Sequence, residues 1–381
     1  MLNNDSSSQH LCFLVSEDWY FCSHRLELAK KAIKDGFEVS LITRVDNHGD
    51  IIREAGINLI PLDFNRTKLN LISDVKVLIK ICRAYRVIKP DIVHHVALKP
   101  VIYGSIAALM SSRKHIINAL GGLGYVFSSS RLKARILRPV VKLLFSLILR
   151  RTESCLIVQN RDDFELFANT FKISPSQIKL VRGSGVDSNF YQKLPEPVGK
   201  FTVTLLARML VDKGVYEFVQ AARICKDNGL DIEFLLVGDP DPMNPASIST
   251  NILEKWNSEG DIKWSGFQND ISRIWADSHL SVLPSFREGL PKSLLESAAC
   301  GRAIVTSDVP GCREIVIDGY NGLLVPPKNP DALAAAIQQL YHNDTLRKEM
   351  GGNGRRLIEQ ELSSDIVQNQ LIGLYRRLLT S

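Results

Sequence analysis

Short apolar runs alternate with amphipathic stretches along most of this chain. The apolar runs predict buried strands at 11–16, 38–43, 57–63, 91–96, 115–120, 155–159, 201–207, 232–237, 280–284 and 303–307. The stretches between them have the spacing of helices, and several end at glycine or proline, which predicts helices at 24–35, 71–88, 215–227, 291–300, 330–342 and 345–360. Apolar strands separated by helices are typical of parallel sheets with both faces covered. The pattern therefore predicts an α/β protein with doubly wound, Rossmann-like sheets.

The length of the chain predicts more than one domain. A chain of 381 residues is long for a single domain, and the polar segment 194–200 contains two prolines, as linkers often do. We expect an N-terminal Rossmann-like domain at 1–195 and a C-terminal one from residue 196. In sheets of this kind ligands bind at the carboxyl ends of the strands.

Charge is divided unevenly between the two halves. The net charge is +11 over residues 1–195 and −5 over 196–381, and residues 92–152 contain ten Lys or Arg and no Asp or Glu. Within that stretch, residues 131–151 carry seven cations among aliphatic side chains. Basic amphipathic segments bind anionic membrane surfaces, although a core helix whose cations extend to water has the same pattern. Nucleic acid is a poorer partner, because only Phe145 of this segment is aromatic.

Cysteine usage and the apolar runs indicate the compartment. The seven cysteines are odd in number and none form a C-x-x-C pair, which argues against a disulfide framework or a structural zinc site. Residues 1–10 are polar and do not resemble a signal sequence, and no apolar run reaches about 18 residues. We expect a cytoplasmic protein without a transmembrane helix.

The densest candidate chemistry lies at residues 285–296, Ser-Phe-Arg-Glu-Gly-Leu-Pro-Lys-Ser-Leu-Leu-Glu. Glu288 is predicted on a loop after a buried strand, and Glu296 on the helix that Pro291 begins and Gly301 ends. Backbone N–H groups at a helix N-terminus favour anions, and a carboxylate accepts hydrogen bonds from adjacent hydroxyls. This arrangement suits a phosphorylated ligand with hydroxyl groups. The alternative is a pair of solvated acids on an ordinary amphipathic helix.

Three motifs together resemble one enzyme family. Glu288-x7-Glu296 is similar to the paired-glutamate signature of retaining glycosyltransferases of family 4, which have the GT-B fold. The strand at 201–207, followed by Arg208, four residues and Lys213-Gly214, resembles a second family motif. The third comprises 300–306, 311–316 and 319–325. The resemblance is strong over 201–350 and looser in the N-terminal half. It implies two Rossmann-like domains (1–195 and 196–362) with a cleft between them, and a final helix in 363–381 that crosses back to the first.

The resemblance also implies roles for individual residues. Arg208 and Lys213 are expected to bind the diphosphate of a nucleotide sugar, with UDP as the expected carrier. No metal cluster is visible in the sequence, so we expect that no metal is required. Glu296 is expected to bind the ribose hydroxyls and Glu288 those of the transferred sugar, so that Glu288, Arg208 and Lys213 form the catalytic set. The remaining expected donor contacts are Gly289, Leu290, Pro291, Gly266, Phe267 and Gly122. Asp239-Pro-Asp241 is the only D-x-D motif, and its position after an apolar run favours a turn over a metal site.

The N-terminal half is expected to bind the acceptor. The loop at 16–25 ends in His24-Arg25, which resembles a bacterial subgroup that builds lipid-linked surface sugars, and a His-Arg pair at a helix start suits a phosphate. His95 and Lys99 are further candidates from the same resemblance. The alternatives are a Ser23 helix cap with solvated neighbours, and a histidine packed within its strand.

These features predict a peripheral enzyme on the inner face of the cell membrane. It would move a hexose or N-acetylhexosamine, with retention, from a UDP-sugar to a polyprenyl-diphosphate-linked saccharide in bacterial surface polysaccharide or glycan assembly. Residues 131–151 would contact the anionic membrane. Three other interpretations stay open: a soluble transferase with a non-lipid acceptor, a nucleotide-sugar epimerase, and a catalytically silent protein that retains the fold.

Overall fold

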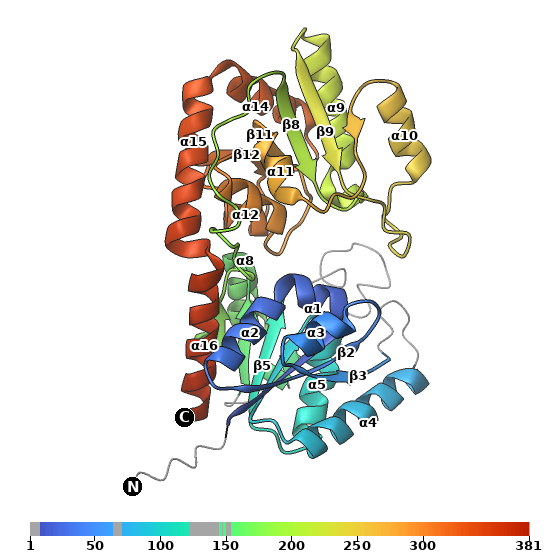
Figure 1. Cartoon of the computed structure of the whole chain (residues 1–381), viewed down its shortest axis with the longest axis vertical. Helices are drawn as coiled ribbons and strands as arrows, with labels where there is room; N and C mark the ends of the chain where they lie inside the picture. Colours follow the sequence, from blue (N-terminus) through green and yellow to red (C-terminus); the bar gives the residue numbers. More distant parts are fainter. Residues whose placement is uncertain (1–7, 64–70, 122–144, 147, 150–153, 381) are drawn as a thin grey trace. The chain divides into compact units, whose positions relative to one another are not determined.

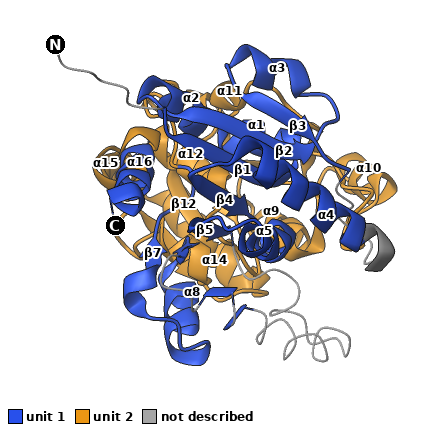
Figure 2. Cartoon of the chain, turned by 90° about the horizontal axis from the view of Figure 1, so that it is seen from below, with its two compact units in different colours: residues 1–184, 368–381 blue, residues 185–367 orange. Residues whose placement is uncertain are grey.

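The computed structural model describes residues 8–63, 71–121, 145–146, 148–149 and 154–380. The chain forms two compact units (Figure 2): unit 1 comprises Met1–Ser184 and Gln368–Ser381, and unit 2 comprises Gly185–Val367. Each unit contains one sheet in which neighbouring strands pair in parallel. The predicted α/β class with two Rossmann-like sheets is therefore confirmed.

In the described part of unit 1, the sheet has seven strands in the order β3-β2-β1-β4-β5-β6-β7. The first three strands extend the sheet to one side, from β1 to β2 and β3, and the next four extend it to the other side, from β4 to β7. The strand order therefore changes direction between β1 and β4. Right-handed crossovers then place α2 and α5 on opposite faces (Figure 1). The strands are β1 (His10–Glu17), β2 (Glu38–Arg44), β3 (Asn58–Pro61), β4 (Ile92–Val96), β5 (His115–Leu120), β6 (Ser154–Val158) and β7 (Ile178–Leu180). Among the residues described up to Ser184, the helices are α1 (Asp18–His24), α2 (Leu26–Lys34), α3 (Gly49–Glu54), α4 (Leu71–Ile88), α5 (Leu98–Met110) and α8 (Arg161–Glu165).

Helix α16 (Ser364–Thr380) begins in unit 2, and from Gln368 onward it belongs to unit 1. The hydroxyl of Tyr375 lies 2.8 Å from Nδ1 of His94 on β4, and its ring meets the ring of Phe37 edge-on. Tyr375 and His94 have no exposed surface. The end of the chain is thus anchored in the core of unit 1.

The sheet of unit 2 has six strands in the order β10-β9-β8-β11-β12-β13, and its direction changes between β8 and β11. Helices α9 and α14 pack together, and α12 packs against α11 and α15. The strands are β8 (Phe201–Leu206), β9 (Ile232–Val237), β10 (Lys263–Trp264), β11 (Leu280–Leu283), β12 (Ala303–Ser307) and β13 (Gly322–Val325). The helices are α9 (Val215–Asp227), α10 (Thr250–Ser258), α11 (Ile271–Ala276), α12 (Lys292–Ala299), α13 (Pro310–Arg313), α14 (Pro330–His342) and α15 (Asp344–Leu357).

Three local predictions were wrong. The segment 16–25, expected as a loop, contains α1, and the helix expected at 24–35 is interrupted at Arg25, whose φ of −134° lies outside the helical range. Pro291 is the N-cap of α12 rather than its first helical residue. Strands β7, β10 and β13 were not predicted, since periodicity is a weak signal at lengths of two to four residues. Strands β3 and β11, which have four residues each, were predicted from the apolar runs 57–63 and 280–284.

The two units divide at residue 184 rather than at the proline-containing segment 194–200. That segment is anchored on unit 2. Both carboxylate oxygens of Glu196 accept from the Arg347 guanidinium at 2.8 Å, and Arg302 donates to the carbonyls of Leu194 and Pro195. Two buried arginines therefore hold a segment whose composition alone is typical of a linker.

Candidate functional site

The candidate donor residues gather at the carboxyl edge of the unit 2 sheet, where the strand order changes direction between β8 and β11. Lys213 ends a single turn, Val211–Lys213, shortly after β8, and Gly214 follows it with φ +72°. A Cβ atom on Gly214 would clash with the carbonyl of Pro284, which directly follows β11. The backbone N–H of Phe286 donates to the carbonyl of Asp212 at 2.9 Å. Only a glycine at 214 allows these two loops to approach so closely.

This approach brings Lys213 to Glu288. The Lys213 Nζ lies 2.5 Å from Glu288 Oε1, and the Ser285 hydroxyl donates to the same oxygen at 2.6 Å. The Glu288 side chain is only 8% exposed, so water screens this pair weakly. The structure therefore brings together two residues that were predicted to act on neighbouring parts of one ligand.

Arg208 has a different partner. Its Nη1 lies 2.7 Å from Oδ2 of Asp241, in the loop that follows β9. That loop pairs with the segment after Arg208, through a bridge between Leu210 and Ser247 and a hydrogen bond from Val211 N to the carbonyl of Ala246. The second acid of the D-x-D motif thus binds the predicted phosphate-binding arginine.

The first acid of that motif, Asp239, is also occupied. Its Oδ1 accepts from the backbone N–H of Phe267 at 3.0 Å, and Gly238 N donates to the carbonyl of Gly266 at 2.8 Å. Asp239 therefore positions the loop that contains Gly266 and Phe267, two of the expected donor contacts, and Phe267 is 67% exposed. Within the described ranges, no group of three or more His, Cys, Asp or Glu is placed to bind a metal.

Glu296 lies on α12 with 5% of its surface exposed. The Tyr191 hydroxyl donates to its Oε1 at 3.1 Å, and Lys292 Nζ lies 3.7 Å from the same oxygen. Burial raises the pKa of Glu296, while the Lys292 ammonium and the Tyr191 hydrogen bond oppose that shift. Burial and the nearby carboxylate also raise the pKa of Tyr191, so this hydroxyl remains a donor.

Tyr191 is a site residue that sequence reasoning missed. The Arg355 guanidinium fixes its backbone, donating to the carbonyls of Tyr191 (2.6 Å), Ala299 (2.8 Å) and Ser188 (3.0 Å). Tyr191 and Glu296 are 105 positions apart in sequence, and no local motif links them. Only the tertiary fold reveals this contact.

Gly289, Leu290 and Pro291 form the connection between Glu288 and α12. Gly311, at the start of α13, packs so closely that a Cβ atom there would clash with the carbonyl of Gly289. The later glycine-containing motif therefore supports the turn between the two glutamates. Gly122, the remaining expected donor contact, lies outside the described residues.

The candidate acceptor residues of unit 1 are less uniform. His95 has no exposed surface: its Nδ1 lies 2.8 Å from Asn118 Oδ1, and its Nε2 lies 3.1 Å from the Tyr85 hydroxyl. Burial lowers the pKa of His95 to about 4, so the ring is neutral. The acceptor-binding assignment of His95 is therefore corrected to a packed strand histidine, the alternative that the sequence left open.

The other three candidates differ in exposure. Arg25 is 4% exposed and donates to the carbonyl of His24 at 3.1 Å, with its Nε buried and lacking a hydrogen-bond partner. His24 is half-buried, with its ring 4.4 Å from the ring of Tyr20. Lys99 is half-buried in the first turn of α5, and burial lowers its pKa. The acceptor roles of these three residues stay predictions.

Most of the basic segment 131–151 lies outside the described residues. Three side chains near its end, Phe145, Ile148 and Leu149, are buried in the core of unit 1 with Phe167 and Phe171. In the part of the chain that is described, no helix combines the length and apolar character needed to cross a membrane.

Comparison with known proteins agrees with these features. The family model for glycosyl transferases group 1 matches residues 187–357, and the model for glycosyl transferase 4-like proteins matches residues 10–160. The chain is 28% identical to N,N'-diacetylbacillosaminyl-diphospho-undecaprenol alpha-1,3-N-acetylgalactosaminyltransferase of Campylobacter jejuni, over 92% of this chain and 94% of that protein. It is 26% identical to UDP-Gal:alpha-D-GlcNAc-diphosphoundecaprenol alpha-1,3-galactosyltransferase of Escherichia coli, over 73% of both chains.

A solved structure shows the same fold. The structure of Anabaena HepE in complex with UDP superimposes with a TM-score of 0.79 at 18% sequence identity, covering 97% of this chain and all of that one. Because the two parallel sheets match along nearly the whole length, the predicted GT-B fold is confirmed.

Proposed function

Since this chain is a glycosyltransferase that belongs to the group 1, family 4-like transferases of GT-B fold, we propose that it transfers a hexose or N-acetylhexosamine from a UDP-sugar to a polyprenyl-diphosphate-linked saccharide. The product would serve bacterial surface polysaccharide or glycan assembly. The observation that carries the proposal is the contact of Lys213 with Glu288 at the carboxyl edge of the unit 2 sheet. It joins a cation for the leaving diphosphate to an acid for the transferred sugar.

The donor side follows from the charges at this edge. Arg208 offers a planar set of donors and Lys213 a compact ammonium, and together they would neutralise the diphosphate as the sugar–phosphate bond breaks. Because this positive charge comes from side chains, we propose that the transfer proceeds without a metal. The printed names of the E. coli relative and of the HepE complex contain UDP, which supports UDP as the carrier.

The two acids would hold hydroxyl groups. Glu288 exchanges one contact with Lys213 or Ser285 for hydroxyls of the transferred sugar, and Glu296 accepts from the ribose while Tyr191 fixes its orientation. In this proposal neither acid is a covalent nucleophile, and the leaving phosphate assists attack on the same face, so that configuration is retained.

The acceptor side rests on two relatives. The names of the C. jejuni and E. coli enzymes both specify an acceptor linked to undecaprenyl diphosphate. We propose an acceptor of that class, bound by unit 1 through residues that include Arg25 and Lys99. An enzyme with this acceptor works at a bilayer, so we place it on the inner face of the cell membrane.

Transfer assays test the proposal. Purified protein is incubated with UDP-sugars and a polyprenyl-diphosphate saccharide, with and without EDTA, and the product's anomeric configuration is determined by NMR. We expect retained configuration and undiminished rates in EDTA. Full activity in both Glu288→Gln and Arg208→Ala would overturn the assignment. Turnover of the UDP-sugar without acceptor, giving an epimer, would favour an epimerase instead.

A further inference from the structure

The outer face of α4 carries exposed aliphatic side chains that do not pack in the core of unit 1. The inner face packs in the core through Val77, Ile81 and Tyr85. On the outer face, Val75, Ile79 and Val87 are 54%, 45% and 79% exposed. Their spacing of four and eight residues places them along one side of the helix. Exposed aliphatic side chains aligned in this way are unusual on a surface helix that contacts only water.

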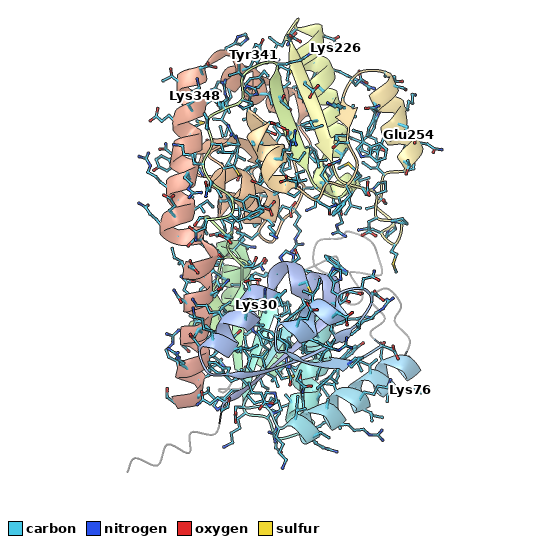
Figure 3. The ribbon with its side chains drawn as sticks, in the orientation of Figure 1. Lys30, Lys76, Lys226, Glu254, Tyr341 and Lys348 are labelled. Carbon is cyan, nitrogen blue, oxygen red and sulfur yellow. The ribbon has the colours of Figure 1, made fainter. Side chains whose placement is uncertain are left out.

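Four cations share this side. Lys76, Lys80, Arg83 and Arg86 are all exposed and recur at intervals of three or four residues. Figure 3 labels Lys76, which points away from unit 1. We call this set, the aliphatic residues Val75, Ile79 and Val87 and the four cations beside them, the α4 surface.

Acidic residues contribute little to this surface. Asp74 is the single acid between 71 and 88; it is half-buried and lies beside Tyr103 of α5. Asp63 lies 3.7 Å from Lys80, but it is a fully exposed side chain, so the pairing is weak. The α4 surface therefore keeps a net positive charge.

The adjacent end of α5 extends the apolar part. Arg86 Nη2 donates to the carbonyl of Met110 at 3.1 Å, and the Met110 Sδ lies 3.8 Å from Cys82 Sγ. The Met110 side chain is 55% exposed and that of Leu109 39%. The cations and aliphatic groups are thus interleaved over two neighbouring helices.

Helix α2 of the same unit provides a contrast. Its exposed cations Lys30 and Lys34 lie on a helix that has no large exposed hydrophobic residue among those described. Lys30 Nζ pairs with Glu27 at 2.8 Å. This is the ordinary pattern of a solvated helix, and it makes α2 a matched control for α4.

We propose that the α4 surface lies on an anionic lipid bilayer, with its cations against lipid headgroups and its aliphatic side chains in the interface. The inference deepens the proposed function and rests on it, because it names the surface by which an enzyme with a lipid-linked acceptor reaches the membrane. The surface depends on described residues only and is separate in sequence from residues 131–151.

The charge pattern favours lipid over other partners. A two-fold symmetric contact with a second copy of the chain would place like charges of α4 against one another. A nucleic acid would engage the cations but leave Val75, Ile79 and Val87 without a role, and no aromatic residue on this face can stack with bases. An anionic bilayer satisfies both groups at once.

Vesicle flotation with the full-length protein tests the inference. The vesicles are phosphatidylcholine with or without phosphatidylglycerol, at low and high salt. We expect the wild type to bind only the phosphatidylglycerol vesicles, and Lys76→Glu/Lys80→Glu to weaken that binding at least about tenfold. The control Lys30→Glu/Lys34→Glu, with the same change in net charge, should weaken it less than about threefold. Ile79→Ser should weaken binding with no change in charge.

Equal losses of vesicle binding in the α4 and α2 variants would show that only net charge matters, and would overturn the inference. A wild-type protein that does not bind anionic vesicles would overturn it as well. Circular dichroism melts confirm that each variant is folded. An assay of sugar transfer to a short-chain acceptor in solution tests the proposed function separately from membrane binding by the α4 surface. If the wild type transfers sugar but the α4 variants float normally, the inference fails alone. If the α4 variants lose vesicle binding but the wild type transfers no sugar, the proposed function fails alone.

Discussion

The carboxyl edges of the two sheets differ in how their candidate residues are held. In unit 2, Lys213, Glu288, Arg208 and Glu296 each have a charged or hydroxyl partner within 3.1 Å. In unit 1, His95 belongs to a fully buried network, and only half-buried His24 and Lys99 and buried Arg25 remain as candidates. Charged side chains that already hold one another in place can bind a donor whose nucleotide part does not vary.

We expect the largest effect from substitutions that break the Lys213–Glu288 contact of unit 2. Lys213→Met and Glu288→Gln should each lower kcat/KM by about 10²–10³-fold, because each removes a group that acts on charge or hydroxyls in the transition state. Steady-state kinetics with a saturating acceptor measures this. Lys200→Met is the control for loss of a paired lysine, since Lys200 forms an exposed 2.7 Å pair with Asp231 away from the site. A similar loss of kcat/KM in the control would show that the Lys213–Glu288 contact has no specific role in transfer.

The second prediction concerns stability at the edge of unit 1. His95→Leu should lower the free energy of unfolding by about 2–4 kcal/mol, because it leaves Asn118 and Tyr85 without their buried partner. The turnover of the protein that remains folded should stay within about twofold of the wild type. Denaturant unfolding and activity per folded molecule are the measurements. A large loss of turnover with normal stability would return His95 to the acceptor site.

The same histidine predicts a pH dependence. Its pKa falls from 6.5 to about 4 on folding, so the unfolded chain binds more protons between these values and stability drops as the pH falls through this window. The contribution is about 3 kcal/mol in full. In His95→Leu, the curve of unfolding free energy against pH should be flatter between pH 6.5 and 4. Parallel curves for the two proteins would contradict a buried neutral ring.

We expect a smaller effect from removing the Tyr191 hydroxyl of unit 2. Tyr191→Phe should weaken UDP binding by about five- to tenfold, which corresponds to one hydrogen bond. It should also raise the pKa of Glu296 further, since the hydroxyl opposes the effect of burial. Calorimetric titrations of UDP between pH 5 and 8 test both points, and the defect should be larger at low pH. A defect independent of pH would mean that Tyr191 acts by packing alone.

The smallest effect concerns the exposed pair of Arg208 and Asp241. Asp241→Asn should change the unfolding free energy by less than about 1 kcal/mol, because exposed ion pairs contribute little. UDP affinity should rise by about two- to threefold, since Arg208 no longer has a competing carboxylate. Thermal melts with and without UDP measure both quantities. A loss of affinity would show instead that Asp241 orients Arg208 for binding.

Residues close in sequence were the ones that the sequence predicted well. Strand and helix periodicity identified most elements of both sheets, and the spacing of Glu288 and Glu296 placed them correctly on a loop and a helix. His95 was a candidate from the subgroup resemblance, and neither that resemblance nor the residue type distinguishes a buried strand histidine from an exposed one. Tyr191 and Asp241 were missed as partners, because their contacts join segments 105 and 33 positions apart. Such contacts arise from sheet topology, which periodicity does not encode.

A crystal structure with a bound UDP-sugar tests the central claim most directly. We expect the diphosphate between Arg208 and Lys213, the ribose at Glu296 and the sugar hydroxyls at Glu288, all at the carboxyl edge of the unit 2 sheet. A nucleotide bound elsewhere, or one that leaves the Lys213–Glu288 and Tyr191–Glu296 contacts without a ligand beside them, would contradict it.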